Sequence, residues 1–243
     1  MVALQEPQRG QSSEPAVNGK KARAPLSRER ILAAGIAVVE KQGFDGLTIR
    51  NVARELGFAP MALYTHIRNK DELVDDVLDS LLSGIQFYNS MSTDWQDQLR
   101  QFVKAYRAFL LRYPDAVPHL MAGAAHSTPG ARRVFEMLLR IFRHAAYEDE
   151  GAVMGAFTVL QFVHGSTYLS AAPLNGDPAK IRSELQSLPA SQYTSTVRAA
   201  AELGRLPANQ RFDATLDVLI RGLEEALPRP GGGIGRIFGF GRR

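Results

Sequence analysis

The chain has 243 residues, a formal net charge of +4 and no cysteine, and its 45% hydrophobic and 22% charged content is ordinary for a globular protein. Without cysteine it can form no disulfide, no thiolate metal site and no cysteine nucleophile, which fits a reducing cytoplasm. It has no apolar run of about 18 residues and no apolar core in its polar N-terminal stretch, so we expect neither a membrane span nor a secretion signal.

The charge is distributed unevenly. Residues 1–70 carry 11 basic and 6 acidic residues, residues 71–227 carry 14 and 19, and residues 228–243 carry 4 basic residues and no acidic one. A basic end on an acidic body suits a protein that binds a polyanion through one end only. Chance scatter of surface charge is the alternative.

Residues 1–24 are rich in Gln, Ser, Pro and Gly, so we predict a disordered arm. Lys20, Lys21 and Arg23 cluster directly before the first predicted helix. Basic arms can enter the minor groove of DNA beside a helix in the major groove. A leader that only confers solubility is the alternative.

The first helix is predicted from Ser27, a good N-cap, to Gln42, and Gly43 ends it. The stretch from Thr48 to Lys70 then predicts two short helices joined by a tight turn. Gly57 supplies the conformational freedom of a sharp corner, and Pro60 suits a helix start. The inward apolar residues at helical spacing are Ile49, Val52, Ala53, Leu56, Leu63 and Ile67.

The outward residues of this stretch include no acid. They combine phosphate ligands with partners for thymine methyl groups, on a helix that fits the major groove of DNA. Ordinary bundle packing is the alternative. The outward residues are Arg50, Met61, Ala62, Thr65, His66 and Lys70, with Tyr64 at the edge.

This pattern resembles the DNA-binding domain of the TetR family of transcriptional regulators over about 50 of the 243 residues. The matching positions are Gly46-Leu47-Thr48-Ile49-Arg50, Val52-Ala53, Leu56-Gly57, Ala62-Leu63-Tyr64, His66 and Asn69-Lys70-Asp71-Glu72-Leu73. The resemblance implies DNA contacts, carried over position by position, at Thr48, Arg50, Pro60, Met61, Ala62, Tyr64, Thr65, His66 and Lys70.

We expect different roles within this set. Arg50 is the best candidate for reading a base, through guanine, whereas Tyr64, His66 and Lys70 suit phosphates. The sequence departs from common family usage at residues 60–62, which offer no side-chain hydrogen bond. More of the specificity therefore falls to Arg50, to DNA shape and to the arm.

The rest of the chain predicts helices only. Asn69 and Glu72 form a capping box at the start of a helix that we expect to reach Tyr88. Further helices are predicted at residues 95–112, 115–122, from Thr128-Pro129 onward, 149–172, 179–188, 192–203 and 211–227. No stretch alternates as a strand would.

The predicted helix at residues 149–172 carries a stripe of side chains that is typical of a binding pocket. Its residues at spacings of four, three and four mix aromatic and polar side chains, as ligand pockets do. Well-satisfied core residues are the alternative. The stripe is Phe157, Gln161, His164 and Tyr168, and the expected facing wall is Trp95, Phe102, Tyr106 and Phe109.

The resemblance adds expectations for this region. Regulators similar to this one bind a small molecule in the C-terminal domain and dimerise through their last long helices, here 149–172 and 211–227. His119 lies in the short helix where tetracycline-binding members have a histidine for drug and magnesium, so it joins the candidate ligand-binding residues. The 149–172 helix has acids only at its start, Asp149 and Glu150, so we expect no metal and no cofactor.

We therefore expect an all-α homodimer. A three-helix head with a helix-turn-helix occupies residues 25–70, a larger antiparallel helical domain for ligand binding and dimerisation residues 71–227, and a flexible Gly- and Arg-rich tail residues 228–243. It should act as a repressor that a small, mostly apolar molecule releases from a pseudo-palindromic DNA duplex. An activator on this scaffold, or a ligand-binding protein with a vestigial head, are alternatives. Catalytic motifs are absent, so we expect no enzyme.

Overall fold

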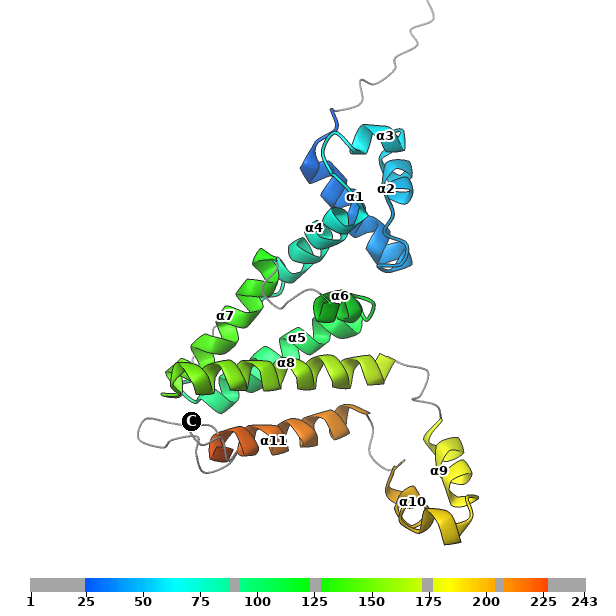
Figure 1. Cartoon of the computed structure of the whole chain (residues 1–243), viewed down its shortest axis with the longest axis vertical. Helices are drawn as coiled ribbons and strands as arrows, with labels where there is room; N and C mark the ends of the chain where they lie inside the picture. Colours follow the sequence, from blue (N-terminus) through cyan, green and yellow to red (C-terminus); the bar gives the residue numbers. More distant parts are fainter. Residues whose placement is uncertain (1–24, 88–91, 123–127, 172–176, 204–207, 227–243) are drawn as a thin grey trace, which may run out of the picture.

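The computed structural model describes residues 25–87, 92–122, 128–171, 177–203 and 208–226, in which helices are joined by turns and short connections and no strand occurs (Figure 1). None of the helices in these ranges is long and apolar enough to cross a membrane. Their bounds are α1 Arg28–Gln42, α2 Ile49–Leu56, α3 Pro60–Leu63, α4 Lys70–Ser83, α5 Trp95–Arg112, α6 Ala116–Ala122, α7 Pro129–His144, α8 Asp149–Ala171, α9 Pro178–Gln186, α10 Ala190–Leu203 and α11 Ala208–Ala226.

The basic arm with Lys20, Lys21 and Arg23, and the tail at residues 228–243, lie outside the described residues. The predictions for these two segments therefore stay predictions. The all-helical fold class predicted from the sequence is confirmed.

The head consists of α1, α2 and α3, and the cap predicted at Ser27 is joined by one at Thr48. The side chain of Ser27 accepts a hydrogen bond from the backbone of Arg30, and the side chain of Thr48 accepts one from Asn51. The inward residues Ile31, Val52 and Leu63 are fully buried. Burial of this small apolar core fixes which side of each helix faces outward.

Gly57 occupies the left-handed conformation that the turn between α2 and α3 requires, with φ 72° and ψ 31°. Alanine there should destabilise the protein by about 1 kcal/mol, because its Cβ crowds the backbone at positive φ. Gly222 of α11 is the matched control, since it is helical and a Cβ there meets nothing within 4 Å. Urea unfolding followed by circular dichroism measures both changes. An equal loss in Gly57→Ala and Gly222→Ala would contradict this reasoning.

Helix α4 leaves the head and enters the body, but it ends earlier than predicted. The sequence predicted a helix to Tyr88, whereas α4 ends at Ser83 and Gly84 caps it. The chain then turns inward, because Ile85 is buried and the ring of Phe87 stacks on Phe102 with centroids 4.8 Å apart. The apolar contacts of Ile85 and Phe87 are therefore favoured over continuation of α4 past Gly84.

The capping box at the start of α4 forms in part. The side-chain oxygen of Asn69 accepts from the N–H of Glu72 at 2.8 Å, as predicted. The carboxylate of Glu72 instead accepts from the N–H of Arg68 at 2.7 Å, one residue before the position that a capping box uses.

The body is built around α5, α7 and α8, and α11 runs beside α8 (Figure 1). The seam of α8 that faces the core consists of small residues such as Ala152 and Ala156, both fully buried. Gly155 allows the ring of Phe142 on α7 to approach so closely that a Cβ would lie 2.6 Å from it. Helices α9 and α10 pack on each other as a hairpin.

Candidate DNA-binding and effector sites

The outer surface of the head is formed by α2, α3 and the turn that follows α3. We call residues 60–68 the recognition segment. Leu63 and Ile67 anchor this segment inward with 0% and 2% exposure, whereas Met61 and Tyr64 expose 74% and 48% of their surface. Arg50, in the first turn of α2, is also exposed. Figure 1 places α2 and α3 at the end of the molecule away from α11.

The other residues predicted to face DNA differ in their solvent exposure and in the hydrogen bonds that they already make. Pro60, Thr65 and Lys70 are exposed, and Ala62 and His66 are half-buried. The hydroxyl of Thr65 donates to the carbonyl of Ala62 at 2.7 Å. Thr48 caps α2, so its hydroxyl oxygen already accepts a hydrogen bond. Thr48 therefore orients α2 whether or not it also contacts DNA.

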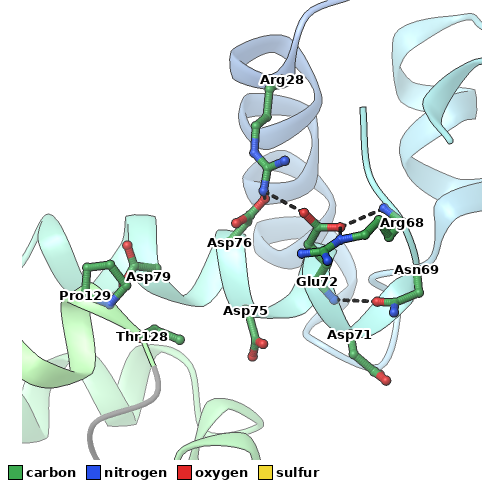
Figure 2. Close-up of a pocket in the computed structure, with 10 residues that line it drawn as sticks. All are labelled: Arg28, Arg68, Asn69, Asp71, Glu72, Asp75, Asp76, Asp79, Thr128 and Pro129. Atoms are coloured by element: carbon green, nitrogen blue, oxygen red, sulfur yellow. Dashed lines mark hydrogen bonds and ion pairs between the residues drawn. The ribbon is translucent and has the colours of Figure 1, made fainter. Parts of the chain in front are cut away.

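Behind the recognition segment, Arg28 of α1 joins it to α4 (Figure 2). One terminal nitrogen of Arg28 donates to the carbonyl of His66 at 3.0 Å, and the other contacts Glu72 at 3.0 Å and Asp76 at 2.6 Å. The N–H of Arg68, then Arg28, holds the pKa of Glu72 down to about 2. Glu72 is consequently charged throughout the neutral range.

These contacts lie in an open pocket of about 550 Å³ between α1, α4 and the start of α7. Asp75 lines it, and burial, followed by the neighbouring Asp71 and Asp76, raises the pKa of its carboxyl. At the far wall the N–H of Gly130 donates to Asp79. The pocket therefore separates the head from α7 by a largely acidic surface.

In the body, the structure brings Tyr106 of α5 and His164 of α8 together. The phenol oxygen and the ring Nε2 lie 2.7 Å apart, and Tyr106 is 2% exposed. Burial lowers the pKa of His164 to about 4 and raises that of Tyr106. The rings of Phe102 and Phe109 lie on either side of Tyr106, with centroids 5.9 and 6.4 Å away. Tyr106 is buried and His164 is half-buried, so the two form a polar pair beside an aromatic wall.

Other predicted pocket residues do not join this pair. Trp95 packs against Tyr147 and Phe142 at the other end of α5. Three residues of the predicted stripe turn outward on α8: Gln161 is exposed, and Phe157 and Tyr168 expose 40% and 54% of their surface. The expectation that these side chains form one cluster with Tyr106 is therefore not met. The physical reason is that only the edge of the stripe, at His164, reaches the core; their role in ligand binding stays a prediction.

His119 takes a different position again. It lies on α6, and its ring centroid is 5.5 Å from that of Phe44, which follows α1 in the head. Among the described residues, no group of three or more His, Asp or Glu is placed to hold a metal ion. His119 therefore forms part of the contact between head and body.

Two family models match the chain. Residues 31–77 match that of the tetR family of bacterial regulatory proteins, and residues 90–227 match that of the tetracyclin repressor-like C-terminal domain. The chain belongs to the TetR family. The predicted family resemblance is thereby confirmed and extends from the head to the body of this TetR-family chain.

Individual relatives agree with this. The class D tetracycline repressor of Escherichia coli is 35% identical over 94 residues, which are 38% of this chain and 43% of that protein, so the match spans less than half of the relative. The class A repressor from transposon 1721 of Escherichia coli is 26% identical over 82% of this chain and 90% of its own. The solved structure of Streptomyces coelicolor ActR in complex with actinorhodin is 26% identical, with a TM-score of 0.72 over 83% of this chain and 98% of that chain.

Sequence reasoning missed the role of Arg28 in this TetR-family chain. Two signals could have found it. A cation in the first turn of a helix opposes the helix dipole, so Arg28 needs a nearby acid. The start of α4 is dense in carboxylates, with Glu72 and Asp76 one turn apart, and both belong to the same helical face.

Proposed function

We propose that this chain is a transcriptional regulator that binds a pseudo-palindromic DNA duplex as a homodimer and responds to a small molecule. The observation that carries the proposal is the outward face of α2 and the recognition segment, where Arg50, Met61 and Tyr64 project and none of the predicted contact residues is acidic. Such a face suits a polyanion, and an exposed helix of this kind suits the major groove.

The homodimer supplies the second half of the DNA site, because two-fold protein symmetry imposes two-fold symmetry on the duplex. Helices α8 and α11 are the proposed interface, as the sequence predicted. Large apolar side chains exposed on both helices support this interface, because burying them against a second protomer would be favourable. These side chains are Val153, Met154, Phe157, Leu169 and Val218.

The proposed effector is a mostly apolar molecule with rings, bound in the helical body near Tyr106 and His164. A polar pair beside an aromatic wall suits an apolar guest that is oriented by one or two hydrogen bonds. The solved complexes of ActR with actinorhodin and with (S)-DNPA support a small-molecule site in a fold of this kind. We propose release of DNA on binding, hence repression, in line with the relatives named repressors.

Selection of duplexes from a random pool tests the DNA-binding function. We expect the wild-type chain to enrich a pseudo-palindrome, which we call the selected duplex. Lys70→Ala should weaken binding to the selected duplex and to random duplexes about equally, because Lys70 meets phosphate. It should also reduce the salt slope by about one per protomer.

Lys104→Ala is the matched control, since Lys104 is an exposed lysine on α5 of the body. Titration of duplex with protein at several salt concentrations measures both slopes. A wild-type chain that enriches no duplex would contradict the proposed function. A Lys70→Ala slope equal to that of the control would remove Lys70 from the DNA contacts.

A further inference from the structure

The recognition segment has little structure of its own to hold its orientation. Helix α3 contains only four residues, and its N-cap, Ala59, makes no side-chain capping hydrogen bond. Helices this short are not stable alone in water, so their orientation comes from tertiary contacts. Leu63 and Ile67 provide apolar contacts on the inner side. Residues 64–68 follow α3 without helical structure, and Ile67 is the one buried side chain among them, so polar contacts add to what holds this end.

Arg28 supplies the contact at this end. Its guanidinium reaches three acceptors on two elements: the carbonyl of His66 at 3.0 Å, the carboxylate of Glu72 at 3.0 Å and that of Asp76 at 2.6 Å. The planar fork of arginine suits such a divergent set, whereas a lysine ammonium on its flexible stem does not fix the same geometry. Figure 2 shows Glu72 and Asp76 projecting from α4 toward Arg28.

Glu72 closes the connection from the other side. One carboxylate oxygen accepts from Arg28, and the second accepts from the N–H of Arg68 at 2.7 Å. The recognition segment is thus tied to the first two turns of α4 twice, through the His66 carbonyl and through the Arg68 N–H. Because α4 continues into the body, a displacement of α4 would displace both ties.

We propose that Arg28 is a positioning residue that couples the recognition segment to α4 and does not bind DNA itself. This inference rests on the proposed function. The charge of Arg28 is compensated locally by Glu72 and Asp76, so a phosphate would have to compete with two carboxylates already within 3.0 Å. The Arg28 side chain is 48% exposed, and exposed ion pairs stabilise folds only weakly. Its loss should therefore change geometry more than it changes overall stability.

Arg28→Met tests the proposal, because methionine keeps an unbranched apolar stem and removes the donors. We expect affinity for the selected duplex to fall about fivefold, the scale of an exposed ion-pair network. Affinity for random duplexes should fall by a smaller factor, and the salt slope should fall by clearly less than one per protomer, since Arg28 itself contacts no phosphate. Arg28→Lys should fall by a similar factor, although it retains the charge.

Arg112→Met is the matched control. Arg112 is an exposed arginine that joins α5 to Glu40 of α1 at 2.9 Å and makes no contact with the recognition segment in the structure. It should leave the affinity for the selected duplex unchanged. Asp76→Asn provides a second route: combined with Arg28→Met, it should weaken binding no further than Arg28→Met alone, because both remove one network.

Three results would overturn the proposal. A salt slope reduced by about one per protomer and restored by Arg28→Lys would make Arg28 a phosphate ligand. Unchanged affinity of Arg28→Met for the selected duplex would mean that the network positions nothing. Fully additive effects of Arg28→Met and Asp76→Asn would show that the two residues act separately. Should Arg28→Met fail to fold, Arg28→Lys and Asp76→Asn still decide the question, and all of these results presuppose a wild-type chain that selects a duplex.

Discussion

Replacing Arg50 with alanine should lower the affinity for the selected duplex by about 1–3 kcal/mol and relax the sequence preference at one base pair of each half-site. This is the range for losing a bidentate contact between arginine and guanine. Arg50 is exposed in the first turn of α2, and the neighbouring recognition segment offers no side-chain hydrogen bond at Pro60, Met61 or Ala62. We therefore expect direct base reading by hydrogen bonds to depend mainly on Arg50.

Arg54 is the matched control for Arg50. It lies one turn further along α2, is also exposed, and carries the same charge. Arg54→Ala should weaken the selected and random duplexes by similar factors if it meets only phosphate. Competition binding against a panel of single base-pair variants measures the preference of each protein. Equal losses on selected and random DNA for Arg50→Ala would show that Arg50 contacts phosphate only.

The head could be predicted from the sequence because its determinants are local. Gly57 in the left-handed region, the Thr48 cap and the inward Leu63 each follow from residue type and spacing within a few positions. Even the error at Glu72 is small. Its carboxylate binds the N–H of Arg68 because Arg28, distant in sequence, draws the same carboxylate toward α1. A contact with a residue distant in sequence therefore determined the orientation of the Glu72 carboxylate, which local capping rules do not specify.

The candidate effector site was harder to predict than the head. The helical spacing of residues shows which side chains share a face, but it does not reveal which neighbouring helix that face contacts. Phe157, His164 and Tyr168 share one stripe of α8. His164 bonds Tyr106 of α5, whereas Phe157 and Tyr168 are exposed, because the buried side of α8 runs through Ala156 and Val163. Phe157 instead packs on Phe135 of α7. A stripe that mixes aromatic and polar residues looks the same in sequence whether it faces a guest, a partner subunit or solvent.

The half-buried His164, paired with Tyr106, should make the stability of the body depend on pH. Burial lowers the pKa of His164 to about 4 from an ordinary value of 6.5. Above about pH 6.5 the ring is neutral in both the folded and the unfolded chain, so His164 adds no pH dependence there. Between about pH 6.5 and 4 only the unfolded chain binds a proton, so the free energy of unfolding falls as pH falls.

The loss from this one residue should reach about 2 kcal/mol between pH 7.5 and pH 5. His164→Gln should remove it, because glutamine retains an acceptor for the Tyr106 hydroxyl but does not titrate in this range. Urea unfolding at a series of pH values measures the free energy, and Trp95, the single tryptophan, reports on the body by its fluorescence. The decisive quantity is the difference between wild type and His164→Gln, in which other titrating groups cancel. A difference that does not vary with pH would contradict a half-buried, neutral His164.

Tyr106→Phe separates the hydrogen bond from the titration. It leaves the Nε2 of His164 without its partner, so the free energy of unfolding near pH 7.5 should fall by about 1–3 kcal/mol. Neither variant should alter affinity for the selected duplex at that pH, because both residues lie in the body and the recognition segment is in the head (Figure 1). If the duplex affinity of Tyr106→Phe fell as far as that of Arg50→Ala, the pair would be part of the route that orients the head, since the body then could not lose this bond without disturbing the DNA-binding face.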